Sequence, residues 1–291
     1  MQIGFIGAGK VGTAFGRYLQ ARGFTICGYY GRHADKVRHA CQMTQSRIFE
    51  QDTDLARDSD MVLITTRDDQ IAGACEALAR RKAVRSDQWI GHMSGAHDTS
   101  VLAPAAQCGA AVFSLHPLQS FADEEKAVSD LPATYFSLEG EDTRVEAVAD
   151  ILERTGNPFF RIAGRHKRLY HLAACIFSNY LATLMDLGLT SLEQSGIDPR
   201  QGFAAMLPLI QGSLNNIATI GPAKALTGPI ARGDASTIAQ HLSALSSHGL
   251  DQLKQAYVFL GLKTLDLASR KILTDQDKIA AIRALLETNK V

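Results

Sequence analysis

The chain has 291 residues, 46% of them hydrophobic, so it can bury a sizeable core and divide into two domains. Thirty acidic side chains balance thirty basic ones, which gives a formal net charge of zero. This balance argues against a general nucleic-acid binder or membrane-surface binder. We therefore expect a small-molecule substrate, and neither nucleic acid nor a membrane as a partner.

The five cysteines are odd in number and contain no C-x-x-C pair. This usage is typical of reduced thiols in a cytoplasmic protein, and not of a disulfide framework or a zinc site. No signal-peptide pattern precedes the first predicted strand, and no apolar run looks long enough to span a bilayer. The sequence thus predicts a cytoplasmic protein without a structural metal.

The N-terminus places a glycine-rich turn, Gly7-Ala8-Gly9-Lys10-Val11-Gly12, between a short apolar run and a helical pattern. In this context G-x-G-x-x-G indicates dinucleotide binding, although a plain glycine-rich turn is the alternative. Gly7 permits the tight turn, Gly9 lets a pyrophosphate approach the backbone, and Gly12 lets the helix lie close to the strand. The N–H groups that open the helix, at Lys10, Val11 and Gly12, would face the phosphates.

The residues after the second predicted strand indicate which dinucleotide is bound. NAD-binding units carry an acidic residue about twenty positions after the glycines, but here Arg32 stands twenty residues after Gly12. A guanidinium can bind a 2′-phosphate that a carboxylate would repel, and His33 adds a second basic side chain. We therefore predict NADP(H). The alternative is a solvated Arg32 with Asp35 as a displaced ribose ligand.

Strand-like and helix-like segments alternate through the first half of the chain, which predicts an α/β fold with a parallel, doubly wound sheet. The strongest candidate for a buried strand covers residues 60–66. The other expected strands after the first cover residues 24–30, 46–49, 88–92, 110–115, 135–138 and 159–162, with helices over 98–108 and 142–155.

After about residue 163 the strand signals stop and long helical patterns follow, over 164–195, 199–219 and most of 234–289. We expect a doubly wound Rossmann NADP-binding domain over residues 1–162 and an all-α C-terminal domain over 163–291. We expect Pro208 to kink the second of these helices. Since the helical domain carries much apolar surface, we also predict that part of it is buried against a second subunit in a homodimer.

Polar side chains follow three neighbouring predicted strands, and ligands of doubly wound sheets bind beyond these carboxyl ends. Thr65 and Thr66 end one strand and are expected to line the cofactor. Ser94 follows the next strand in a glycine-flanked turn, where it could orient the nicotinamide or the substrate. His116 follows the third strand and could act as an acid, a base or a hydrogen-bonding clamp. A histidine that orders the loop before Pro117 is the alternative.

The first long helix offers a second polar set, since Lys167 and His171 are four residues apart and share a face. Ser178 returns to nearly the same angle of the helix, with Asn179 alongside, where Asn179 could help to orient the substrate. At a cleft, Lys167 could polarise a carbonyl or donate a proton as hydride arrives, with His171 sharing that task. The alternative is a solvated lysine at the start of a basic helix. Farther along, Arg232 could clamp a substrate carboxylate, or it could pair with Asp234 while that residue caps the next helix.

Taken together, these segments resemble a family of Rossmann-like proteins with a C-terminal domain of unknown function, often grouped with coenzyme-F420-dependent NADP oxidoreductases. The resemblance covers nearly the whole chain. It implies a Rossmann domain, NADP and a helical domain like that of 6-phosphogluconate dehydrogenase, but no substrate. It rests on the motifs Ser94-Gly95-Ala96, Ser114-Leu115-His116-Pro117-Leu118-Gln119, Lys167 with Tyr170-His171, Ser178-Asn179, and Leu226-Thr227-Gly228-Pro229-Ile230-Ala231-Arg232-Gly233-Asp234.

More distant similarities imply a mechanism. β-Hydroxyacid dehydrogenases and ketopantoate reductases carry a catalytic lysine that Lys167 matches, but His171 stands where their asparagine would be. Prephenate dehydrogenases carry a serine and a His-Pro histidine that Ser94 and His116 resemble, and pyrroline-carboxylate reductases share the architecture. The resemblance implies an NADP(H)-dependent oxidoreductase acting on a small, anionic carbonyl, imine or hydroxy compound. A non-catalytic NADP(H) sensor or interaction protein is the alternative, and reduction of a deazaflavin is a third possibility.

Overall fold

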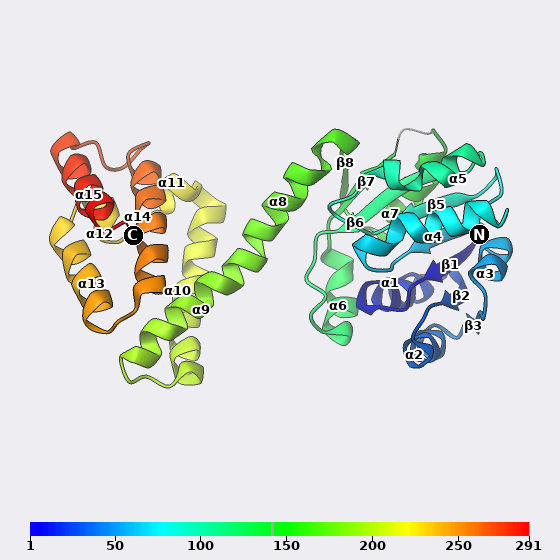
Figure 1. Cartoon of the computed structure of the whole chain (residues 1–291), viewed down its shortest axis with the longest axis horizontal. Helices are drawn as coiled ribbons and strands as arrows, with labels where there is room; N and C mark the ends of the chain where they lie inside the picture. Colours follow the sequence, from blue (N-terminus) through cyan, green and yellow to red (C-terminus); the bar gives the residue numbers. More distant parts are fainter. Residues whose placement is uncertain (141–142, 291) are drawn as a thin grey trace. The chain divides into compact units, whose positions relative to one another are not determined.

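The computed structural model describes residues 1–140 and 143–290 and divides them into two compact units (Figure 1). The first unit covers Met1–Tyr180 and the second covers Leu181–Val291, of which Val291 lies outside the described residues. The boundary that we predict at residues 162 and 163 falls just after the last strand. By packing, the following helix belongs to the first unit. The boundary itself stays a prediction.

The first unit is built on one eight-stranded sheet with the strand order β3-β2-β1-β4-β5-β6-β7-β8. Its first six strands run parallel in the order of a Rossmann domain, so the order reverses between β1 and β4. The doubly wound α/β fold is therefore confirmed. The strands are β1 (Gln2–Ile6), β2 (Thr25–Tyr30), β3 (Arg47–Ile48), β4 (Met61–Ile64), β5 (Trp89–His92), β6 (Ala111–Pro117), β7 (Phe136–Glu139) and β8 (Phe159–Arg161).

One feature of the sheet corrects the prediction of a wholly parallel arrangement, because β7 pairs with β6 in the antiparallel direction. The described connection between them contains two short helices, the 3-10 helix η2 (Leu131–Ala133) and α6 (Glu124–Asp130), which has seven residues or about 10 Å. Helix α6 packs beside α1 (Lys10–Gln20), where Arg17 forms ion pairs with Glu124 and Glu125. The connection therefore does not carry the chain back across the sheet, and β7 begins at the edge where β6 ends.

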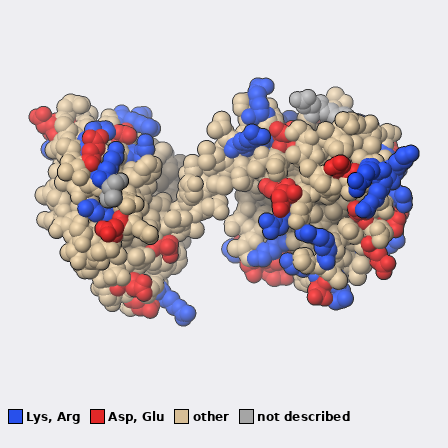
Figure 2. Space-filling view, in the orientation of Figure 1, with Lys and Arg blue, Asp and Glu red and all other residues tan. Residues whose placement is uncertain are grey.

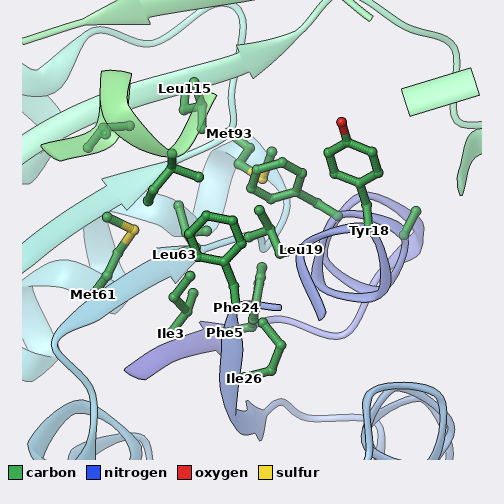
Figure 3. Packing of buried hydrophobic residues seen from close by; sticks show 14 of the residues in the cluster. Ile3, Phe5, Tyr18, Leu19, Phe24, Ile26, Met61, Leu63, Met93 and Leu115 are labelled. Atoms are coloured by element: carbon green, nitrogen blue, oxygen red, sulfur yellow. The ribbon is translucent and has the colours of Figure 1, made fainter. Parts of the chain in front are cut away.

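Helices cover both faces of the sheet, and each face has its own hydrophobic core. One core contains side chains of α1, α2, α6 and α7, including the residues drawn in Figure 3. The other contains side chains of α3, α4, η1 and α5. The helices of this unit not yet given are α2 (Ala34–Thr44), α3 (Asp52–Asp58), α4 (Asp68–Arg80), η1 (Thr99–Leu102), α5 (Ala103–Gln107), η3 (Thr143–Val145), α7 (Glu146–Thr155), η4 (Gly164–His166) and α8 (Lys167–Phe177). The helix predicted over 142–155 begins with a residue outside the described part.

The second unit is helical, as predicted, and acidic side chains begin several of its helices. Asp198, Asp234 and Asp275 each accept hydrogen bonds from N–H groups in the first turn of the helix that follows. For Asp234 this is the capping role that the sequence left open. The helices are α9 (Asn179–Gln194), α10 (Pro199–Ile220), α11 (Pro222–Ala225), α12 (Pro229–Arg232), α13 (Ala235–Ser247), α14 (Asp251–Ala268) and α15 (Gln276–Thr288).

The stretch Gly164–Gln194 corrects our expectation that no apolar run is long enough to span a bilayer. By length and composition alone, this 31-residue helical stretch could cross a membrane. However, it is broken at Ser178, between α8 and α9, and its first helix begins with a lysine buried in the first unit. This part of the stretch is therefore fixed to the sheet domain.

Candidate active site

The glycine-rich turn after β1 has the geometry that the sequence predicts for a dinucleotide cradle. Gly7 adopts a φ of 113°, which side chains rarely allow, and a Cβ there would lie 2.7 Å from the backbone of Thr65. Thr65 secures the turn, since its hydroxyl donates a 2.6 Å hydrogen bond to the carbonyl oxygen of Gly7. The turn is thus fixed between the ends of β1 and β4, where the strand order reverses.

Gly9 and Gly12 differ in what surrounds them. A Cβ at Gly12 would lie 2.5 Å from the hydroxyl of Thr65, so this glycine serves the close packing of α1 on the strands. A Cβ at Gly9 would meet only one atom, the carbonyl oxygen of Thr65 at 4.0 Å. Gly9 is also the N-cap of α1 and offers no side-chain cap to the first helical N–H groups, those of Lys10 and Val11. The space and the donors suit an anionic group such as a phosphate.

The basic residues after β2 lie at the surface, as a 2′-phosphate site requires. The guanidinium of Arg32 is exposed and donates a 2.8 Å hydrogen bond to the side-chain oxygen of Gln70. His33 is exposed at the N-cap of α2, where it makes no capping bond. Asp35, the alternative ribose ligand, pairs with Arg38 at 3.0 Å. Thr66, the last of the predicted cofactor residues, is half-buried after β4.

A cluster of aromatic and imidazole side chains lies at the same edge of the sheet. His116, in β6, and Tyr170, in α8, are joined by a 2.7 Å contact between Nδ1 and the phenol oxygen. The ring of His171 packs edge-on against His116, with centroids 6.2 Å apart. The structure therefore brings together two predicted site residues, His116 and His171, and adds Tyr170, which the sequence offered only as part of a motif.

Gly95 lets the two imidazoles approach the loop after β5. A Cβ at this position would lie 2.6 Å from the ring of His171 and 2.8 Å from Nε2 of His116. Only a residue without a side chain leaves both rings in place. The sequence marks Gly95 as part of the turn after the strand, but not for this reason.

Lys167 is fully buried at the start of α8, beneath this cluster. Its ammonium donates hydrogen bonds of 3.1 Å to the carbonyl oxygen of Ser94 and 2.8 Å to the hydroxyl of Ser114. Burial lowers the pKa of Lys167 to about 8, a shift that the nearby carboxylates of Glu139, Asp98 and Asp68 partly oppose. The lysine thus joins the ends of β5 and β6 to the first helix after the sheet.

Burial and nearby positive charge keep His116 neutral. Burial is the main reason that its pKa falls to about 3, and the Lys167 ammonium adds to the effect. Burial also raises the pKa of Tyr170, so the phenol keeps its proton at neutral pH. The pair therefore consists of an uncharged imidazole and an uncharged phenol that share one hydrogen bond.

Ser94 and His92 organise the loop that carries Gly95. The Ser94 hydroxyl donates to Asp68 at 2.8 Å and accepts from the N–H groups of Ala96 and His97 at 3.2 Å. His92 is fully buried and accepts from the N–H of Ser94, while burial lowers its pKa to about 4. Both side chains are engaged within the chain.

A cleft of about 540 Å³ opens beside this cluster, entirely within the first unit. His116, Tyr170 and His171 line it, whereas Lys167 and Ser94 do not. Cys175 follows one turn after His171, and its sulfur lies 3.7 Å from the ring nitrogen Nδ1. Asn179 also lines the cleft, at the start of α9. The cleft is therefore lined by polar side chains, among them the amide of Asn179, and by the apolar side chains of Leu118 and Phe177.

Arg232, the predicted carboxylate ligand, belongs to the second unit. It is the last residue of α12 and is exposed. The neighbouring Asp234 caps α13, and hydrogen bonds from Thr237 lower its pKa to about 2. The charge of Arg232 also lowers this pKa, so the guanidinium interacts with Asp234 while it stays exposed at the surface of its unit.

Comparisons with known proteins agree with this architecture. Residues 1–117 match the model of a Rossmann-like domain, and residues 134–264 match the model of a domain of unknown function, DUF2520. No curated protein matches the chain.

Solved structures share the fold across nearly the whole chain. A candidate NADP oxidoreductase from Bacteroides fragilis is 21% identical, with a TM-score of 0.75 over 91% of this chain and 98% of its own. Protein TM1727 from Thermotoga maritima is 21% identical, with a TM-score of 0.61 over 98% of both chains. An imine reductase from Myxococcus stipitatus in complex with NADP⁺ is 14% identical, with a TM-score of 0.65 over 99% of this chain and 93% of its own. The chain therefore combines a Rossmann-like domain with this domain of unknown function.

Proposed function

We propose that the protein is an NADP(H)-dependent oxidoreductase that transfers hydride to or from a small, anionic carbonyl, imine or hydroxy compound in the cytoplasm. One observation carries the proposal. The dinucleotide cradle at Gly7–Gly12 follows β1, and the cluster of His116, Tyr170 and His171 is built on the end of β6 and on α8, at the same carboxyl edge of the sheet. Solved structures with similar folds include a pyrroline carboxylate reductase with NADP bound and imine reductases in complex with NADP⁺ or NAD⁺.

The described residues fit a phosphorylated dinucleotide. Gly9 leaves open space at the uncapped N-terminus of α1, and this is the position of a pyrophosphate in such folds. Arg32 and His33 offer exposed positive charge beyond β2, where the adenosine 2′-phosphate would be bound. When bound, the nicotinamide would supply or accept the hydride.

In this proposal, His116 is the residue that handles the substrate oxygen or nitrogen. With Tyr170 donating its proton to Nδ1, the neutral imidazole carries its own proton on Nε2, the atom beside Gly95. A neutral N–H donor can polarise a carbonyl or imine without the cost of a buried imidazolium. His171 lies against it and lines the same cleft, so it is the candidate for exchanging a proton with solvent.

Lys167 supports this arrangement from below the cleft. Its ammonium is 2.8 Å from Ser114 in β6 and is bonded to the loop of Ser94 and Gly95. The positive charge helps to keep His116 neutral. We assign Lys167 a positioning and electrostatic role in place of direct proton transfer, since it does not line the cleft.

The variant Gly9→Ala tests the dinucleotide site directly. A methyl group at Gly9 meets no atom of the chain closer than 4.0 Å, and the φ of −83° suits any residue. The free energy of unfolding should therefore fall by no more than about 1 kcal/mol, the cost of alanine in place of glycine at an N-cap, while the affinity for NADPH falls at least tenfold because the methyl group occupies the pyrophosphate space. Gly73→Ala in α4 is the matched control, since its Cβ also meets nothing. If Gly9→Ala binds NADPH as tightly as the unaltered protein, the proposed site is wrong.

Turnover then tests the reaction. We expect NADPH oxidation or NADP⁺ reduction with at least one keto acid, cyclic imine or hydroxy acid, and His116→Ala should lower kcat by about 10² or more. Tight NADPH binding without turnover of any compound from these three classes would favour a sensor over an enzyme.

A further inference from the structure

His116, Ser137 and Phe160 form one row across strands β6, β7 and β8. His116 pairs with Ser137 in the antiparallel ladder, and Ser137 pairs with Phe160 in the parallel one. Side chains at paired positions of neighbouring strands point to the same face of the sheet. Tyr170 of α8 covers this row, since its phenol oxygen lies 2.7 Å from Nδ1 of His116 and its ring packs edge-on against Phe160, with centroids 5.9 Å apart. Ser137, the middle residue of the row, therefore lies beneath Tyr170.

The hydroxyl of Ser137 is fully buried, and among the described residues it is the one buried polar side-chain atom without a hydrogen-bond partner. A buried hydroxyl that makes no bond is unfavourable, and native proteins contain few of them. Burial raises the pKa of Tyr170, and the Ser137 hydroxyl is near enough to oppose this rise by donating to the charged phenol oxygen. The hydroxyl thus makes no regular bond to the neutral phenol but can bond a phenolate.

The proposed function, on which this inference rests, creates a need for such a donor. As the substrate carbon accepts a hydride, the Nε2–H bond of His116 breaks and the proton passes to the substrate oxygen or nitrogen. The imidazole then gains a proton at Nδ1, because a buried imidazolate would be costly. The O–H bond of Tyr170 breaks to supply it, since this phenol is the group bonded to Nδ1. The hydride carries both electrons of the reduction, so the net change within the chain is one phenol converted to a phenolate.

A phenolate at Tyr170 needs stabilisation, because burial makes the charged form costly. Lys167 is one source, since its ammonium lies 5.8 Å from the centre of the Tyr170 ring. The Lys and Arg side chains visible in Figure 2 lie at the surface, whereas Lys167 is fully buried, so its charge is screened less by salt. Its N–H groups bond Ser94 and Ser114, so Lys167 acts on the phenol through its charge.

We propose that Ser137 is a positioning residue of the reaction, whose hydroxyl donates a hydrogen bond to the phenolate of Tyr170 as His116 releases its proton. The donor makes no bond while the phenol is neutral and becomes bonded as the charge develops. An interaction that forms only with the developing charge lowers the barrier without stabilising the ground state. Because Tyr170 lines the cleft, water there can restore the phenol proton after turnover. In the oxidation direction, the same hydroxyl stabilises the phenolate that accepts the proton through His116.

A purely structural role of the Ser137 hydroxyl predicts a different effect on stability. Ser59 provides the matched control, because it is also fully buried but donates a 2.7 Å hydrogen bond to the carbonyl oxygen of Leu55. Ser59→Ala should lower the free energy of unfolding in urea titrations, since it loses a bonded hydroxyl. Ser137→Ala should leave the free energy of unfolding unchanged or raise it, since its hydroxyl has no bond to lose.

Steady-state kinetics with a compound that the protein turns over measures the effect on the reaction. Ser137→Ala should lower kcat about three- to tenfold with KM little changed, whereas Ser59→Ala should leave kcat unchanged. Ser137→Cys, whose thiol is only a weak donor, should behave like Ser137→Ala. Because Ser137 acts through Tyr170, Ser137→Ala should have no further effect on kcat in a chain that already carries Tyr170→Phe.

The pKa of Tyr170 provides a readout that needs neither substrate nor cofactor. NMR titration of the full chain labelled at tyrosine Cζ, with Tyr170→Phe to assign the signal, measures this pKa. It should be higher in Ser137→Ala than in the unaltered chain, since the donor to the charged form is lost. The other titratable groups beside the phenol, those of His116, His171 and Lys167, are present in both proteins.

Each of these measurements can overturn the proposal. An unchanged pKa of Tyr170 in Ser137→Ala would do so, as would an unchanged kcat, a loss of stability as large as that of Ser59→Ala, or effects of Ser137→Ala and Tyr170→Phe on kcat that simply multiply. Absence of turnover with every compound tested would count against the proposed function instead. The NMR titration would then still decide whether Ser137 stabilises the phenolate.

Discussion

Replacing Lys167 with methionine should leave the protein at neutral pH as stable as before or more stable, although Lys167 is fully buried. The reason is the cost of holding a charge away from water. Burial lowers the pKa of this lysine from 10.5 to about 8, which corresponds to about 3 kcal/mol of free energy. Methionine has a similar length, and the two acceptors of the ammonium can bond each other, since the Ser114 hydroxyl lies 3.3 Å from the carbonyl oxygen of Ser94.

The pH dependence provides the sharper test. Below pH 8, Lys167 carries its proton in both the folded and the unfolded state, so the cost of burial is fully present. Between pH 8 and 10.5 the folded protein releases the proton while the unfolded chain retains it, so stability rises with pH by up to about 3 kcal/mol. Above that range the cost has disappeared. The advantage of Lys167→Met should therefore be largest at pH 7 and vanish near pH 10.5.

Urea unfolding followed by far-UV circular dichroism, at pH values from 7 to 10.5, measures this difference. Only the difference between the two proteins is used, because cysteines and tyrosines whose pKa values are raised by burial in the folded protein lose their protons in this range once the chain unfolds. Lys36→Met, at an exposed lysine of α2, is the matched control and should show no such dependence. A constant difference across the range, or a loss of more than about 2 kcal/mol in Lys167→Met at pH 7, would refute the reasoning.

Three further predictions follow from the same structure. Arg32→Ser should raise the Kd for NADPH by about 10 to 100-fold and leave the Kd for NADH unchanged, as measured by titration of nucleotide fluorescence. Equal affinities of the unaltered protein for NADPH and NADH would contradict the predicted preference for NADPH. Tyr170→Phe removes the hydrogen bond to Nδ1 of His116, so steady-state kinetics should show kcat about tenfold lower with KM little changed, and an unchanged kcat would exclude Tyr170 from the mechanism. Gly91→Ala would place a Cβ 2.3 Å from the ring of Phe113, so it should lower the free energy of unfolding by about 1–3 kcal/mol in urea titrations, and a neutral effect would show that the core can adjust.

Local signals were sufficient to predict most of the sheet. Runs such as 60–66 and 110–115 predict strands because they are buried on both faces and read as nearly continuous apolar segments. The direction of β7 was not predictable in this way, since Tyr135–Leu138 has the same pattern in either direction. That direction follows from the short connection through α6 and η2, and α6 in turn is fixed by contacts with α1, including the ion pairs of Glu124 and Glu125 with Arg17, more than 100 positions earlier in the chain.

In the candidate site too, residues in local motifs were predictable, whereas residues whose role depends on contacts between distant segments were not. Residues in a contiguous motif, such as Gly7, Gly9 and Gly12, can be predicted from the sequence because the turn needs glycine at fixed spacing. Tyr170 carries no such signal, since a tyrosine one turn into a helix usually packs in a core. Its role comes from the position of α8 against β6, where the phenol lies 2.7 Å from His116. For Lys167, spacing indicates which helix face it occupies, but not the burial that separates it from the cleft.

The charges around His116 determine its protonation state, which the separate sequence motifs do not indicate. Burial, together with the ammonium beneath the cleft, makes an imidazolium costly, so His116 remains neutral, while the raised pKa of Tyr170 keeps the phenol that contacts Nδ1 protonated. An anionic substrate group would be attracted toward Lys167 without displacing it, because the ammonium is already bonded to Ser94 and Ser114. In Lys167→Met the pKa of His116 should therefore rise, and the acidic limb of any pH–rate profile should move toward neutral pH.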